Sequence, residues 1–91
     1  MLDIVASNQF KRDLRLARKR GFQIEVLRLV VNTLANKQTL DAKYRDHELL
    51  GQYSGFCECH VAPDWLLIYR IEDDALELFL FRTGTHSDTE P

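Results

Sequence analysis

All three histidines of this 91-residue chain lie in its C-terminal half, and each has a charged side chain nearby in the sequence. His47 directly follows Asp46, His60 lies four residues before Asp64, and His86 lies four residues after an arginine. Imidazole is the only side chain that ordinarily gains and loses a proton near neutral pH, so it serves as both acid and base. The pattern therefore points first to proton-transfer chemistry.

Five residues form the candidate catalytic set: His47, His60, Asp64, Arg82 and His86. They act together only if the turn after His60 and the end of the last predicted strand share one rim of a sheet, as antiparallel neighbours allow. Such a rim suits metal-independent cleavage of an RNA phosphodiester. One group removes the 2′-OH proton, another protonates the leaving 5′-oxygen, and a cation offsets the charge on the phosphorane. Solvated surface histidines are the alternative that spacing alone leaves open.

A metal site is the rival use of the same segment, because Cys57, Cys59 and His60 are zinc-type ligands. Structural zinc sites favour cysteines separated by two to four residues, whereas here one residue intervenes. Alternation along a strand also places both thiols on one face and His60 on the other. We therefore expect no metal and no other cofactor. The thiols are expected to be reduced, partly buried and non-nucleophilic, since cysteines so placed pair poorly in a disulfide.

Hydrophobic periodicity predicts the elements that must position these residues. The predicted strands cover residues 2–6, 53–61, 65–71 and 75–83, and the predicted helices cover 8–20 and 23–35. Ser7 is a suitable N-cap for the first helix, and Gly21 is a suitable terminator. Residues 36–52 lack periodicity and are predicted to form a loop that carries His47. The sequence thus predicts one α+β domain over residues 1–91, of order β-α-α-β-β-β, with a helical hairpin on a mostly antiparallel sheet.

The charge of the chain is unevenly distributed. The net charge is −2, yet residues 1–20 carry +4 and the remainder carries −6. The basic residues of the first helix are Lys11, Arg12, Arg15, Arg18, Lys19 and Arg20. They form either a solvated helix face or a basic edge that meets phosphate.

Two residues of the predicted strand 65–71 have alternative roles. Trp65 is predicted to be a core aromatic, with stacking on an RNA base as the alternative if its ring lies at the rim. Arg70 lies within an apolar strand, and we expect a structural ion pair with Glu58 or Glu77 across the sheet. The chain has no apolar run near the ~20 residues that cross a bilayer, and its start lacks a signal-peptide pattern. We therefore expect a cytoplasmic protein with no membrane partner.

Three sequence blocks resemble the YafQ branch of the RelE-like toxins. They are Y-R-D-H-E-L-L-G at 44–51, C-H-V-A-P-D-W-L-L-I-Y at 59–69 and F-R-T-G-T-H-S at 81–87. The blocks occur in the family's order and spacing, and the likeness extends over nearly the whole chain. The resemblance implies the RelE-like fold and a toxin of a type II toxin–antitoxin system. Such toxins enter the ribosomal A site and cut mRNA without a metal, leaving a 2′,3′-cyclic phosphate and a 5′-hydroxyl.

The resemblance also implies roles for the candidate residues. His86 and His60 would form the leading acid/base pair, in an order left open, and His47 would transfer a second proton or orient the others. Asp64 would act as an orienting group or base, and Arg82 would stabilise the phosphate. The basic helix would face 16S ribosomal RNA.

The implied partners are the 70S ribosome with its mRNA and a cognate antitoxin, expected to be a ribbon-helix-helix protein with an acidic C-terminal segment. Operator DNA would be bound only through that antitoxin. One departure from the family is the tail at 87–91, which lacks the aromatic residue that relatives carry after this block. It supports an alternative function, a weakly active or inactive homologue that acts mainly as an antitoxin-binding transcriptional co-repressor. A ribonuclease acting on naked RNA is disfavoured, because no extended basic and aromatic surface is apparent.

Overall fold

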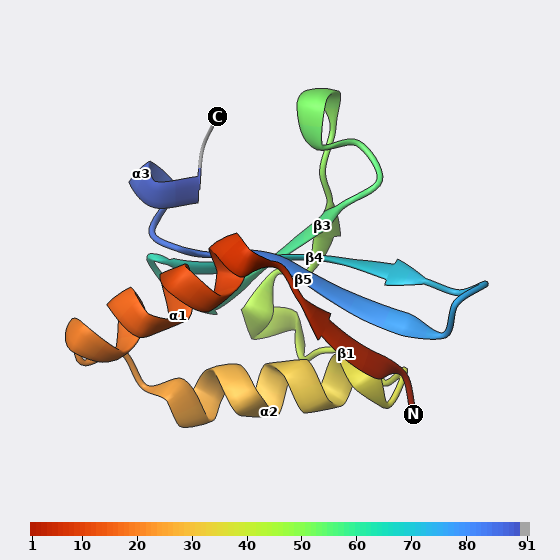
Figure 1. Cartoon of the computed structure of the whole chain (residues 1–91), viewed down its shortest axis with the longest axis horizontal. Helices are drawn as coiled ribbons and strands as arrows, with labels where there is room; N and C mark the ends of the chain where they lie inside the picture. Colours follow the sequence, from red (N-terminus) through yellow and green to blue (C-terminus); the bar gives the residue numbers. More distant parts are fainter. Residues whose placement is uncertain (90–91) are drawn as a thin grey trace.

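The computed structural model describes residues 1–89, and its centre is a five-stranded sheet of strand order β1-β5-β4-β3-β2 (Figure 1). The strands are β1 (Asp3–Ala6), β2 (His47–Glu48), β3 (Cys57–Ala62), β4 (Trp65–Glu72) and β5 (Glu77–Gly84). The helices are α1 (Asn8–Lys19), α2 (Ile24–Ala35) and α3 (His86–Thr89), with short 3₁₀ turns η1 (Ala42–Tyr44) and η2 (Gly51–Tyr53). Only β1 and β5 pair in parallel, so the predicted α+β class and mostly antiparallel sheet are confirmed.

The predicted ends of the first helix are confirmed to within one residue. The Ser7 hydroxyl accepts a hydrogen bond from the Phe10 N–H at 2.9 Å and donates one to the Phe81 carbonyl at 2.7 Å, which ties the helix start to β5. At the other end Gly21 adopts φ +78°, and the Phe22 N–H reaches back to the Ala17 carbonyl at 3.0 Å. This is a glycine-terminated C-cap that turns the chain into α2.

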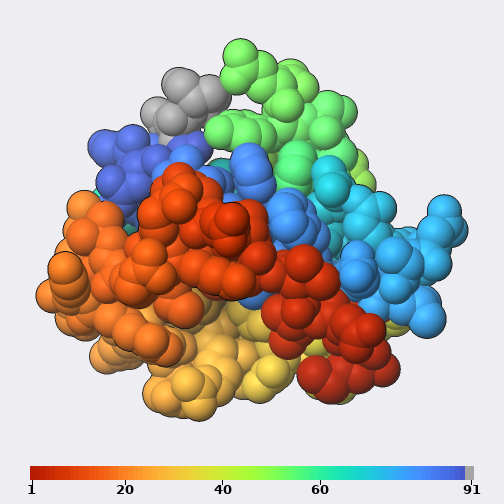
Figure 2. Space-filling model, viewed as in Figure 1, coloured from red at the N-terminus to blue at the C-terminus, as the bar shows by residue number. Residues whose placement is uncertain are grey.

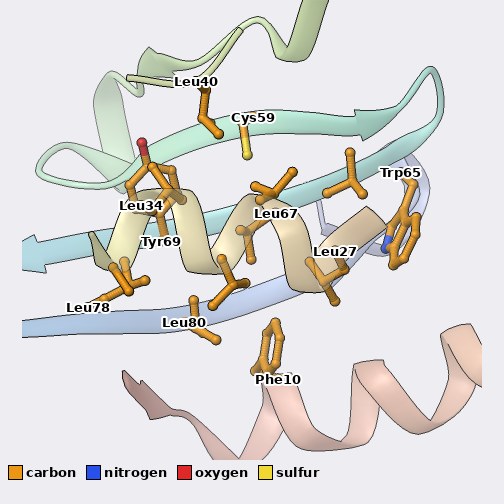
Figure 3. Close-up of a cluster of buried hydrophobic side chains, with 14 of the residues drawn as sticks. Phe10, Leu27, Leu34, Leu40, Cys59, Trp65, Leu67, Tyr69, Leu78 and Leu80 are labelled. Atoms are coloured by element: carbon orange, nitrogen blue, oxygen red, sulfur yellow. The ribbon is translucent and has the colours of Figure 1, made fainter. Parts of the chain in front are cut away.

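The hydrophobic core lies between the helical hairpin and one face of the sheet (Figure 3). Leu27 and Leu34 of α2 and Phe10 of α1 project toward Leu67 and Leu78 on the central strands. Both sheet leucines are completely buried. In Figure 1, α2 lies on this side of the sheet, whereas α3 and the segment around η2 lie on the other. On the second face Leu66 and Ile68 of β4 are buried as well, and polar residues lie toward its margin on β2 and β3.

The structure adds two elements that periodicity missed and shifts two strand starts. Strand β2 and helix α3 are too short to produce a repeating pattern. Strand β3 begins at Cys57 rather than at 53, because η2 and Gly55 (φ +94°) form a turn before it. Strand β5 begins at Glu77 rather than at 75, because Leu76 adopts φ +54° in a turn closed by its N–H on the Asp73 carbonyl. Within residues 1–89, no helix is long and apolar enough to cross a membrane.

Candidate active site

Strand β3 supplies the centre of the candidate site. Its residues alternate between faces, so Cys59 and Val61 enter the core while Glu58 and His60 point to the opposite face. Each of these two polar side chains is 17% exposed, enough to meet a bound molecule but not to move freely.

His47 reaches the same place through strand pairing. Strand β2 is antiparallel to β3 and sets His47 directly opposite Glu58. The Nε2 atom of His47 lies 3.6 Å from Glu58 Oε1, and the Nε2 atom of His60 lies 4.0 Å from that same oxygen. One carboxylate oxygen is therefore shared between two imidazoles. Sequence reasoning assigned Glu58 no role beyond pairing with Arg70, and only the strand register shows that it faces the imidazoles.

His86 completes the row of imidazoles. It begins α3, and its ring centroid lies 5.6 Å from that of His60, which in turn lies 6.4 Å from that of His47. Asp64, in the turn between β3 and β4, accepts from the His86 ring Nδ1 at 2.8 Å and from its backbone N–H at 3.2 Å. These hydrogen bonds hold the pKa of Asp64 below its ordinary value. Four of the five candidate residues thus converge, in two imidazole–carboxylate arrangements.

Arg82, the fifth candidate, is engaged elsewhere. Its Nε donates to Asp13 Oδ2 at 2.8 Å, and its Nη2 donates to Asp13 Oδ1 at 3.3 Å and to the Asp88 carbonyl at 3.0 Å. The hydrogen bond to Asp13 raises the pKa of Arg82, so the guanidinium stays charged. In the sheet register Arg82 lies opposite Ile68, which lies opposite Glu58. The backbone of Arg82 is therefore two strand spacings, or about 10 Å, from the strand that carries Glu58 and His60. Within residues 1–89 two of its three nitrogens, Nε and Nη2, donate to protein oxygens, and Nη1 does not.

Asp13 was missed by sequence reasoning because an aspartate on a basic amphipathic helix reads as a solvent-facing residue. The side chain is only 7% exposed. Strand β1 ends at Ala6, opposite Leu80, so the edge of β5 beyond that point has no strand partner. Asp13 fills this edge by accepting from the Thr83 N–H at 3.1 Å as well as from Arg82. A buried polar group is satisfied in this way, and α1 is fixed to the strand that leads to His86.

The basic helix largely faces solvent, as Figure 2 shows for α1 at the front of the molecule. The exposed cations are Lys11, Arg12, Arg15, Arg18 and Lys19. Arg20 differs, because its Nη1 forms an ion pair with Asp88 Oδ2 at 2.7 Å. It is therefore partly committed to holding α3, and the surface available to phosphate consists mainly of the other five cations.

Trp65 is a core residue, and the alternative of base stacking is wrong. The residue is 3% exposed, its ring packs against Phe22 at 5.0 Å between centroids, and its Nε1 donates to the Thr83 hydroxyl at 2.8 Å. The partner expected for Arg70 is also wrong. Arg70 pairs with Glu72 on its own strand and stacks over the Phe56 ring, with its guanidinium carbon 4.7 Å from the ring centroid.

The cysteines are free thiols, as expected. Cys59 is completely buried, and this burial raises the pKa of its thiol to about 12. Since Cys59 enters the core while His60 faces the opposite side, the zinc-type ligands do not converge. Within the part of the chain that the structure describes, no group of three or more His, Cys, Asp or Glu side chains is arranged to hold a metal ion.

A groove of about 680 Å³ opens beside His60, between α2 and the end of β3. Val26 and Leu29 form part of its apolar wall, and Lys43 and Arg45 add two cations. These cations lie outside the basic helix, in the loop whose sequence shows no periodicity. They place positive charge in the groove that His60 also lines.

Comparisons with known proteins identify the family of the chain. A sequence model described as "Bacterial toxin of type II toxin-antitoxin system, YafQ" matches residues 2–90. The mRNA interferase toxin YafQ of Escherichia coli K12 is 41% identical over 86 residues, which cover 93% of this chain and 91% of that protein.

Two solved structures have closely similar folds. A crystal structure of a metal-bound toxin from Helicobacter pylori has a TM-score of 0.94 and 44% identity, covering 99% of this chain and 100% of that one. The toxin chain in the crystal structure of the E. coli DinJ–YafQ toxin–antitoxin complex has a TM-score of 0.88 and 38% identity, covering 99% and 98%. The chain therefore belongs to the YafQ family of bacterial type II toxin–antitoxin toxins.

Proposed function

We propose that this protein is an endoribonuclease that cuts mRNA in the ribosomal A site by metal-independent general acid/base catalysis. The observation that carries the proposal is the row of three imidazoles, His47, His60 and His86, steadied by Glu58 and Asp64 on the open face of the sheet. The name of the E. coli relative, an mRNA interferase toxin, supports the same reaction.

The spacing of the imidazoles suits a transfer of two protons across one phosphate. The rings of His60 and His86 are 5.6 Å apart between centroids, so the two imidazoles are close enough to reach different oxygens of one phosphodiester. One imidazole removes the 2′-OH proton and the other protonates the departing 5′-oxygen, which yields a 2′,3′-cyclic phosphate and a 5′-hydroxyl. Asp64 holds the His86 ring in orientation through its hydrogen bond with Nδ1, Glu58 places a carboxylate near the other two rings, and His47 acts beside them.

Positive charge is placed to hold the RNA on either side of this row. Arg82 Nη1 is assigned to the scissile phosphate, and Lys43 and Arg45 border the groove beside His60. The five exposed cations of α1 are assigned to ribosomal RNA, whose contacts supply most of the affinity. The action takes place in the cytoplasm, and a co-expressed antitoxin restrains it, as the E. coli DinJ–YafQ complex illustrates for a relative.

The test is to add purified protein to ribosomes programmed with a defined mRNA and to map the new 5′ ends. Cleavage within the A-site codon is expected. His86→Ala or His60→Ala is expected to lower the single-turnover rate by about 10² to 10⁴-fold, the usual contribution of a positioned acid or base. Protein stripped of transition metals by a chelator is expected to cleave at the same rate. Uncut message, or cutting by His86→Ala and His60→Ala at the rate of the unmodified protein, would contradict the proposal.

The alternative, an inactive co-repressor, is favoured only by the missing aromatic residue after His86, and two of the tail residues, Glu90 and Pro91, lie outside the described part of the chain. Induction of the protein without its antitoxin distinguishes the two functions, because a pure co-repressor does not stop growth.

A further inference from the structure

His47 occupies the least supported segment of the candidate site. Its strand β2 has only two residues and pairs with β3 alone. The side chain is 49% exposed, whereas that of His60 is 17% exposed. A two-residue ladder at the edge of a sheet is too short to be stable by itself. Something else must hold this histidine against Glu58.

The residue before it supplies an anchor. Asp46 accepts a hydrogen bond at 2.5 Å from the hydroxyl of Tyr69. Tyr69 belongs to β4, a central strand, and is 3% exposed. Figure 3 shows its ring within the core and its oxygen at the margin, on the side of the loop that carries Leu40. The bond thus connects the segment before the edge strand β2 to a buried residue of a central strand.

The hydroxyl at position 69 needs a reason, because the core position itself would be filled equally well by phenylalanine. A buried hydroxyl costs free energy unless it is hydrogen-bonded. A hydroxyl forms a stronger hydrogen bond with an ionised carboxylate than with a neutral acceptor. Burial and the hydrogen bond to Asp46 both raise the pKa of Tyr69, so the hydroxyl remains a donor. The pair is therefore a directional connection between the core and the loop.

The backbone next to Asp46 also orients the His47 imidazole. Arg45 adopts a left-handed conformation, with φ 50° and ψ 45°, and its carbonyl lies 2.7 Å from His47 Nδ1. A carbonyl only accepts, so Nδ1 carries the proton and donates it. This bond fixes the ring rotation and turns Nε2 toward Glu58. If Asp46 is released, the segment that presents both the carbonyl and the ring is free to move.

We propose that Tyr69 is a positioning residue, which holds His47 in the site through its hydrogen bond to Asp46. The expected effect on cleavage rests on the proposed function, whereas the expected effect on the position of His47 does not. Tyr69 touches neither the RNA nor the reacting atoms, because its side chain lies on the core side of the sheet with Cys59.

The first test measures catalysis with Tyr69→Phe, which keeps the ring and removes only the hydroxyl. We expect the saturated single-turnover rate to fall by roughly tenfold to a hundredfold, since small displacements of a catalytic group have effects of this size. The toxin concentration at half-maximal rate should not change, because no ribosome contact is altered. Tyr69→Phe should have no further effect in a His47→Ala background.

The second test is independent of activity. In NMR spectra, Tyr69→Phe should shift or broaden the His47 ring signals and accelerate hydrogen exchange of the Leu49 N–H, which bonds to the Phe56 carbonyl beside β2. Unchanged His47 signals would overturn the inference whatever the activity. The inference would also be overturned if Tyr69→Phe lowered the cleavage rate by the same factor in the unmodified protein and in the His47→Ala variant. If His47→Ala cleaves normally while the NMR change appears, the positioning stands and the catalytic role proposed for His47 fails.

Discussion

Replacing Asp13 with asparagine tests the connection between α1 and the strand that leads to the site. The carboxylate is 7% exposed and accepts from Arg82 Nε, Arg82 Nη2, the Thr83 N–H and the Gln9 amide, at distances of 2.8 to 3.3 Å. Breaking a buried ion pair by removing one partner costs about 3–5 kcal/mol, because the other charge is left without compensation. The retained amide oxygen still accepts one bond, so we expect a loss of about 3 kcal/mol in the free energy of unfolding.

The loss should be measured by urea denaturation followed by the fluorescence of the buried Trp65. For a domain of this size, about 3 kcal/mol corresponds to a fall in Tm of about 12–24 °C. Asp74→Asn, in the exposed turn between β4 and β5, is the matched control and should change stability by less than about 0.5 kcal/mol. A loss below about 1 kcal/mol for Asp13→Asn would refute the reasoning.

A double-mutant cycle with Arg82→Met shows whether the two residues act as a pair. Arg82→Met alone leaves the Asp13 carboxylate buried without its cation and should also be strongly destabilising. The double variant removes both charges, so it should lose at least about 1 kcal/mol less than the two single losses combined. Strict additivity would mean that Asp13 stabilises the fold only through Thr83 and Gln9, and the assigned coupling of α1 to Arg82 would be wrong.

Two further predictions concern the turn that carries His86. Gly84→Ala should lower the free energy of unfolding by about 1–3 kcal/mol, because Gly84 has φ +156° and an added Cβ would lie 2.9 Å from the Asp88 Cβ. Thermal denaturation and the cleavage rate measure the effect. A variant with unchanged stability would show that the turn is not fixed there. Arg20 holds the pKa of Asp88 below its ordinary value of 3.8. The resulting stabilisation is present above 3.8 and is lost as the pH falls through the lower, folded pKa. Arg20→Ala should therefore make the free energy of unfolding less dependent on pH in this acid range. If the variant and the unmodified protein show the same dependence on pH, the assigned effect of Arg20 on Asp88 is wrong.

The larger elements were predictable because their signals repeat. Ser7 and Gly21 mark the ends of α1 by their own chemistry, and the long apolar run from Trp65 marks a strand that is covered on both sides. The same logic fails for β2, since two residues have no period. It also fails for the start of β5, because Leu76 adopts a left-handed conformation that its residue type does not suggest.

The site was predictable in its residue types but not in its pairings. The three histidines and Asp64 could be selected because their chemistry is unusual in so small a chain. Glu58 and Asp13 could not, because a carboxylate is ordinary on any surface, and only the register of β2 on β3 and the end of β1 show what each one faces. The prediction of Trp65 as a core residue is confirmed, but the sequence left base stacking open because a residue at a strand start can point to the rim or into the core.

The strand order has a consequence for how the chain matures during its own synthesis. Strand β1 is made first, yet its ladder partner is β5, the last strand in the sequence. Asp13 and Arg20 likewise wait for partners about 70 positions downstream. Until β5 has left the exit tunnel, β1 has no ladder partner and the sheet cannot close. Closure of the sheet therefore depends on contacts between residues far apart in the sequence, the kind of contact that slows folding.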